Sequence, residues 1–62
     1  MEIKLNDKLF LVINEGLFPN QYRYDIYEYG KIVGAFMLDT IIKDINQLEV
    51  FTIDYLRFIW RL

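Results

Sequence analysis

Residues 8–14, Lys-Leu-Phe-Leu-Val-Ile-Asn, are apolar on both faces of an extended backbone. Side chains of a strand alternate between its two faces. One face here is aliphatic and the other is partly aromatic, namely Leu9, Leu11 and Ile13 against Phe10 and Val12. A strand of this kind is typical of the centre of a sheet, where both sides are covered. The rest of the chain must therefore supply cover for two apolar faces.

Three other segments have the pattern of strands, and they are residues 2–5, 21–29 and 32–37. Between the first two strands, Asn6 and Asp7 tolerate the left-handed backbone that a two-residue hairpin turn needs. The four segments in chain order therefore predict a series of antiparallel hairpins.

Glycine and proline mark the remaining connections. Residues 15–20 contain one of each and predict a loop, the only one that these residues mark strongly. Gly30-Lys31 is a plausible tight turn after the third strand. Gly34 interrupts the fourth strand, which predicts a bulge or close packing against another backbone.

The third strand carries four tyrosines, and they divide between its two faces. Tyr22 and Tyr24 share a face with Ile26, whereas Tyr27 and Tyr29 lie on the opposite face. The switch of the tyrosines from one face to the other predicts a bend near Ile26, in a strand that contributes to two apolar layers. We expect one pair in the core and the other at an interface, and the pattern does not distinguish them.

The spacing of the apolar residues changes from alternation to helical spacing after the fourth strand. Residues 38–48 have apolar side chains at helical spacing and predict an amphipathic helix of about three turns, with Asp39 or Thr40 as its N-cap. Residues 50–55 alternate again and favour a fifth strand. Residues 56–62 fit either a strand or a short terminal helix.

These elements predict a single α+β domain over residues 1–62. The sheet is expected to be small, twisted and antiparallel, with about five strands, the element order ββββαβ and one helix across one face. The second apolar face must then meet something else. A second copy could cover it in a sheet-on-sheet dimer, another protein could dock there, or the strands could close into a small β-barrel with one helix.

The composition argues against catalysis, metal binding and a cofactor. The chain has no cysteine, histidine or serine, which removes most nucleophile–base pairs and the preferred zinc ligands. Its three glycines stand apart and form no phosphate-binding loop. A domain this small buries only about 60% of its unfolded surface, and without disulfides or a metal the usual remedy is oligomerisation. We therefore predict a homodimer and no enzyme.

The net charge of −2 disfavours partners that carry phosphate. Nucleic acids and anionic membranes both prefer a basic surface. The sequence also has no apolar run of bilayer length and no hydrophobic signal region, so we expect a cytoplasmic protein. Heavy use of Ile, Lys, Asn, Tyr and Phe is typical of AT-rich genomes and hints at a phage or mobile element, with the host cell as its location.

Seven residues are candidates for partner binding, and they are Tyr22, Arg23, Tyr24, Tyr27, Tyr29, Phe58 and Trp60. Tyrosine, tryptophan and arginine dominate the energetics of protein interfaces. The tyrosines could instead pack in the core or stack on single-stranded nucleic acid. The apolar C-terminal segment could close the core, swap into a neighbour or enter a partner's groove.

The favoured interpretation is a small interaction protein that binds and modulates or inhibits a host protein through an aromatic sheet face or edge. An alternative is an acidic mimic of nucleic acid that inhibits a glycosylase or nuclease. In size, acidity and order of elements the chain resembles small dimeric phage inhibitors of uracil-DNA glycosylase, without a shared residue motif. A second alternative is a single-stranded nucleic-acid binder that uses tyrosine stacking.

Overall fold

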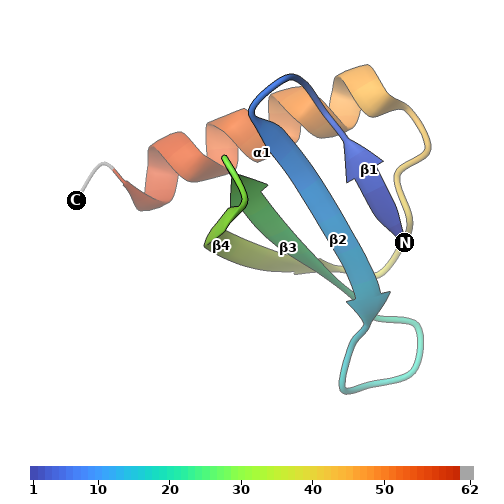
Figure 1. The fold of residues 1–62 in the computed structure, drawn as a ribbon. Coiled ribbons are helices and arrows are strands. Elements are labelled where there is room, and N and C mark those ends of the chain that lie inside the picture. The colour runs from blue at the N-terminus through green and yellow to red at the C-terminus, as the bar shows by residue number, and fades with distance from the viewer. Residues whose placement is uncertain (61–62) are drawn as a thin grey trace.

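The computed structural model describes residues 1–60 as four antiparallel strands in one open sheet and one helix (Figure 1). The elements are β1 (Glu2–Lys4), β2 (Leu9–Glu15), β3 (Tyr22–Glu28), β4 (Lys31–Leu38) and α1 (Ile45–Ile59). The strand order β1-β2-β3-β4 follows the chain, so every pairing is a hairpin. The apolar strand β2 lies inside the sheet, between β1 and β3, as its pattern predicts.

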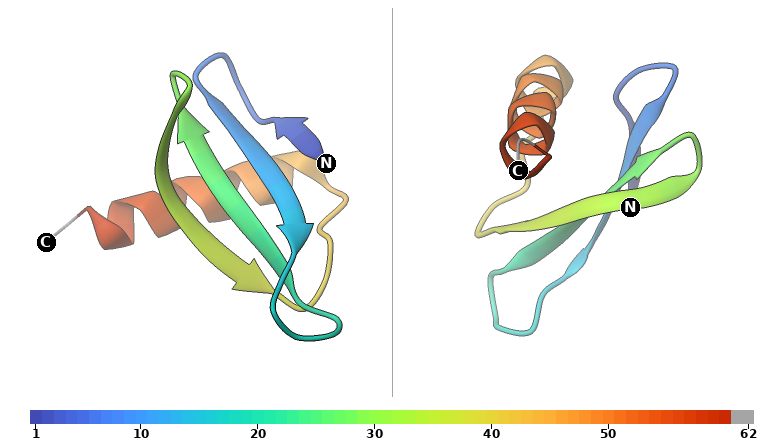
Figure 2. Two further views of the ribbon diagram at one scale, coloured as in Figure 1. Left: turned by 60° about the horizontal axis from the view of Figure 1, so that its bottom comes forward. Right: turned by 90° about the vertical axis from the view of Figure 1, so that its left-hand side faces the viewer.

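The core lies between one face of the twisted sheet and α1 (Figure 2). Its buried apolar residues come from β2, β3, β4, the β1–β2 connection and the helix, and they are Leu5, Leu9, Leu11, Ile13, Tyr24, Ile26, Phe36 and Leu48. The helix crosses the strands diagonally, and its C-terminal end projects past β4 (Figures 1 and 2). One layer of helix therefore covers one face of the sheet.

Two expectations for the sheet are wrong. Within residues 1–60 the sheet has four strands rather than about five, and it is open rather than closed into a barrel. The short strand β1 and the eight-residue strand β4 form its two edges. The fifth strand is missing because residues 50–55 belong to α1.

The helix begins later than predicted. Leu38, the expected first residue, pairs with Tyr22 as the last residue of β4. The N-cap is Asp44, not Asp39 or Thr40. Its carboxylate accepts the backbone N–H groups of the second and third helical residues, at 3.0 and 3.2 Å. This cap fixes the start of the helix at Ile45.

Residues 50–55 form the middle of α1 instead of a strand. Phe51, Ile53 and Tyr55 alternate as strand residues do, but burial follows the helical spacing of Leu48 and Thr52, both of which are fully buried. The helix continues to Ile59 and is capped by Trp60, so the helical interpretation holds for residues 56–59. The rest of that segment, residues 61–62, lies outside the described residues.

The predicted irregularity of the tyrosine strand is confirmed. The pairing of β3 with β4 shifts between Ile26 and Tyr27, which leaves Val33 as an extra residue in β4. The next residue, Gly34, faces α1, and a Cβ atom there would lie 3.0 Å from Cδ1 of Ile59. The expected bulge therefore lies next to Gly34, whereas the close neighbours of Gly34 are side chains and not another backbone.

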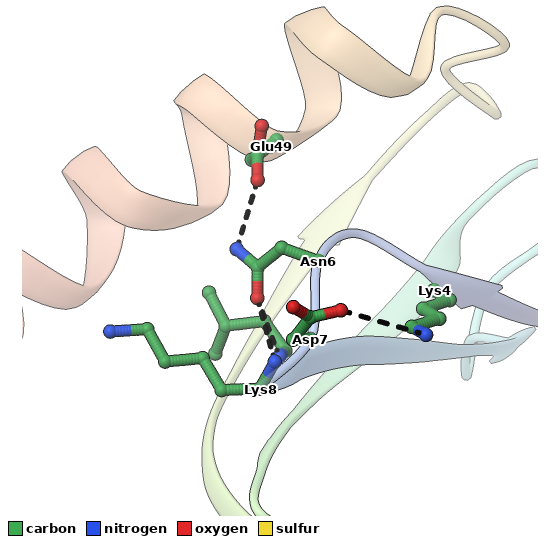
Figure 3. A network of polar contacts seen from close by, with 6 residues as sticks. Lys4, Asn6, Asp7, Lys8 and Glu49 are labelled. Atoms are coloured by element: carbon green, nitrogen blue, oxygen red, sulfur yellow. Dashed lines mark hydrogen bonds and ion pairs between the residues drawn. The ribbon is translucent and has the colours of Figure 1, made fainter.

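Two turns differ in detail from the predicted ones. The β3–β4 turn is Tyr29-Gly30, with φ angles of 49° and 79°, rather than Gly30-Lys31. The β1–β2 connection covers residues 5–8 rather than two residues. There the Asn6 side chain accepts the backbone N–H groups of Lys8 and Leu9, and donates to Glu49 of α1 at 2.9 Å (Figure 3). This amide ties the turn to the helix.

Candidate functional site

The face of the sheet opposite α1, here called the open face, carries the second set of strand side chains. Because Leu9, Leu11 and Ile13 are buried toward α1, the alternate residues of β2 point away from it. The strand register places side chains of three strands together on this face, namely Phe10 and Val12 of β2, Arg23, Asp25 and Tyr27 of β3, and Ile32, Ala35 and Met37 of β4. No element of residues 1–60 covers them (Figure 2).

An aromatic pair stands on the open face. Phe10 and Tyr27 are cross-strand partners, and their rings stack with centroids 4.8 Å apart and planes 4° apart. Ile32, opposite Tyr27 on β4, is 59% exposed, and Met37 is 45% exposed. The aromatic pair and the two β4 residues therefore form an apolar area of this face that is in contact with solvent.

The charges of the open face largely cancel. Arg23 and Asp25 form an ion pair with 3.2 Å between Nε and Oδ1. Asp25 is buried, with Val12 and Ala35 as its cross-strand neighbours. A buried carboxylate needs such a partner, because an unpaired charge would be costly to bury. The pair leaves little net charge at the middle of this face.

The four tyrosines of the predicted site separate between the two layers. Tyr24 is fully buried beneath α1 and stacks on Phe36 with ring centroids 4.9 Å apart. Tyr22 lies half-buried at the margin of the same core. Tyr27 lies on the open face, and Tyr29 is exposed in the β3–β4 turn.

The other predicted residues lie on different elements. Arg23 shares the open face with Tyr27, whereas Phe58 and Trp60 are exposed on the end of α1 that projects past β4 (Figure 1). The seven candidates thus do not form one site. The open face includes apolar residues that the prediction left out, namely Phe10, Val12, Ile32, Ala35 and Met37. The signal for the first two was the two-sided pattern of residues 8–14.

The carboxylates of the described residues do not gather. Over residues 1–60 no group of three or more histidine, cysteine, aspartate or glutamate side chains could hold a metal ion. Asp25, Asp44 and Glu49 make the intramolecular bonds described above. In the same part of the chain, no helix has the length and hydrophobicity needed to cross a membrane.

Comparisons of the chain with protein-family models, with curated proteins and with solved structures find no match. The surfaces that the fold leaves exposed are therefore the features that bear on its function.

Proposed function

We propose that this chain is a non-catalytic interaction protein and that its open face binds another protein. The observation that carries the proposal is the two-sided strand β2. One side of β2 is buried under α1, while Phe10 and Val12 on the other side belong to a face that no element of residues 1–60 covers. Contiguous apolar surfaces of this kind mark interaction sites on small proteins.

The chemistry of the open face defines the partner. The stacked pair of Phe10 and Tyr27 is a rigid aromatic anchor, and each costs little side-chain entropy to immobilise in a complex. Ile32 and Met37 extend the apolar area toward the β4 edge. Since the Arg23–Asp25 pair is already neutralised, the matching surface should be apolar at its centre and bear no strong charge opposite that pair.

A protein without catalytic groups acts on its partner by occupying surface. We therefore expect the chain to modulate or inhibit a host protein by covering one of its functional surfaces, rather than to modify it.

Two features argue against the two alternatives, a mimic of nucleic acid and a binder of single-stranded nucleic acid. The carboxylates are scattered over strands, turns and helix, whereas a mimic of nucleic acid needs them in a row at phosphate spacing. The aromatic rings of Phe10 and Tyr27 stack on each other, and Arg23, the arginine of the same face, is neutralised by Asp25. Stacking of single-stranded bases needs free ring faces in a basic groove.

A matched pair of substitutions tests the proposal. Ile32→Glu places a charge on the open face, and Ile45→Glu places the same charge at a similarly exposed position of α1, since the two side chains are 59% and 50% exposed. Each variant is used as bait in quantitative affinity capture from a host lysate, and the captured protein is then purified for titration. We expect the partner to bind the wild type and Ile45→Glu, and to bind Ile32→Glu at least about tenfold more weakly, a loss of about 1.4 kcal/mol. Equal binding by all three baits would refute the open face as the site.

A further inference from the structure

The outward side of α1 is a second exposed apolar surface, separate from the open face. Val50 and Phe58 are 60% and 73% exposed, and together with Asp54 they form a line four residues apart along the helix. We call this surface the outer ridge and define it as Val50, Asp54, Arg57, Phe58 and Trp60. Four of these residues, Asp54, Arg57, Phe58 and Trp60, line one shallow hollow. Phe51 lies on the flank of the helix, where its ring packs on Phe36 of β4.

The position of α1 makes the outer ridge accessible. The helix packs on the sheet with its inward side, through Leu48 and Thr52, and no other element of residues 1–60 lies over its outward side (Figure 2). The C-terminal end of the α1 ribbon projects past β4 (Figure 1). Phe58 belongs to this last turn of the helix and is 73% exposed.

The charges of the outer ridge are self-complementary. Asp54 and Arg57 are its charged members, and neither forms an ion pair with another side chain of residues 1–60. A surface that bears one acid and one base can match a copy of itself when the two are related by a two-fold axis. A different partner would have to supply that complement separately.

We propose that the outer ridge binds the outer ridge of a second copy of this chain, with the two helices antiparallel. A two-fold axis at the level of Tyr55 brings Asp54 of each copy beside Arg57 of the other, because these residues lie on either side of that level. A parallel arrangement would instead place Asp54 beside Asp54 and Arg57 beside Arg57, which is repulsive. The charge pattern thus selects the antiparallel dimer.

The apolar residues fit the same arrangement. Reversal of one helix about Tyr55 brings Phe58 and Trp60 of each copy to the levels of positions 52 and 50 of the other, beside Val50. The apolar members of the ridge expose on the order of 400 Å² per copy, if aromatic side chains contribute about 150–250 Å² each when fully accessible. A stable interface buries about 800 Å² per partner, somewhat more than half of it apolar, so the ridge supplies most of the apolar area that a dimer needs.

Charge reversal tests the dimer. Asp54→Arg gives a ridge with two arginines, and Arg57→Asp gives a ridge with two aspartates. In sedimentation equilibrium at low salt we expect the wild type to dimerise, and each variant to dimerise at least about tenfold more weakly. An equimolar mixture of the two variants should dimerise again, as a heterodimer, because every acid then faces a base. Asp39→Arg, an exposed residue of the β4–α1 connection, makes the same charge change away from the ridge and should leave the dimer intact.

Three results would overturn the proposal. The first is a wild-type chain that stays monomeric up to about millimolar concentration, the weak limit of specific association. The second is a mixture that fails to restore a dimer lost in both single variants. The third is a dimer that both charge variants keep and Ile32→Glu abolishes, which would assign the contact between copies to the open face. The outer ridge and the open face lie on opposite layers of the fold, so the charge variants should still bind the protein partner. Loss of the dimer and loss of partner binding can therefore be observed separately, and one proposal can fail while the other holds.

Discussion

The hydroxyl group of Tyr24 joins the sheet to the connection between β4 and α1. It donates to the carbonyl of Thr40 at 2.6 Å and accepts the N–H of Ile42 at 3.2 Å. The Tyr24 ring is fully buried and stacks on Phe36. Tyr24→Phe removes the hydroxyl and both hydrogen bonds while the ring and its packing remain, so the change isolates the value of this link.

The expected loss follows from the two bonds. A hydrogen bond contributes about 1 kcal/mol net, and a buried group left without its partner costs about 1–3 kcal/mol. Thr40 is exposed and its carbonyl can bind water instead, whereas the half-buried N–H of Ile42 loses its partner. We therefore expect Tyr24→Phe to lower the free energy of unfolding by about 2 kcal/mol. In a domain of this size that corresponds to a fall in Tm of about 8–16 °C.

Tyr55→Phe is the matched control. The Tyr55 hydroxyl donates to the carbonyl of Ala35 at 2.7 Å in an exposed position, where water can replace it. We expect this variant to lose less than about 0.5 kcal/mol, since an exposed bond is exchanged for a bond to water. Urea unfolding followed by circular dichroism measures both variants, with equal m-values as the check that the unfolded states are comparable. If Tyr24→Phe unfolds at the same urea concentration as Tyr55→Phe, the reasoning about the buried link is refuted.

Three further substitutions test other parts of the fold. Thr52 is fully buried and its hydroxyl has no hydrogen-bond partner in the described chain. Thr52→Val should therefore raise the free energy of unfolding by about 1 kcal/mol, measured by urea titration. A free energy of unfolding below that of the wild type would show that the hydroxyl has a hydrogen-bond partner in solution. Asp44→Ala removes the N-cap and should cost about 1 kcal/mol together with helical signal in circular dichroism, whereas unchanged values would place the helix start elsewhere. Gly34→Val adds a side chain where Cδ1 of Ile59 already lies 3.0 Å from the Cβ position, and should cost about 1–3 kcal/mol. The same variant should increase hydrogen exchange in the last turn of α1, and unaltered exchange there would contradict the close contact.

The hairpin series was predictable because its signals are local. Alternation in β2 and β3, the loop around Gly16 and the interruption at Gly34 each depend on a few neighbouring residues. These signals specify the strands and their order in the chain. The exact turn at Tyr29-Gly30 was missed because tyrosine seldom adopts a positive φ, and glycine supplies only one of the two positions.

The helix was misplaced because two apolar periods overlap in the sequence. Residues 38–48 and residues 45–59 both present apolar side chains at helical spacing. The choice between them depends on the pairing of Leu38 with Tyr22, a tertiary contact that no local pattern contains. Strand propensity in residues 50–55 was overridden by the burial of Leu48 and Thr52 against the sheet.

The candidate site was predictable only in outline. The two-sided pattern of residues 8–14 correctly indicated a second apolar face, since Phe10 and Val12 lie on the open face. It could not indicate which tyrosines join them, because that depends on the side of the sheet on which α1 packs. The helix lies over Tyr24, so Tyr27 is left on the opposite side.

The chain-following order of the strands has a consequence for how the protein folds. Each strand pairs with the next one along the chain, and residues 29–30 alone separate β3 from β4. Closing so short a loop costs little entropy, and a hairpin of this kind forms in about 1–10 μs. Contacts between α1 and the β1–β2 hairpin, such as that of Glu49 with Asn6 in its turn, join residues up to 43 positions apart and must form later. During that interval both faces of β2 are exposed to solvent, and the nascent sheet is then at its most prone to aggregate, before the helix has docked.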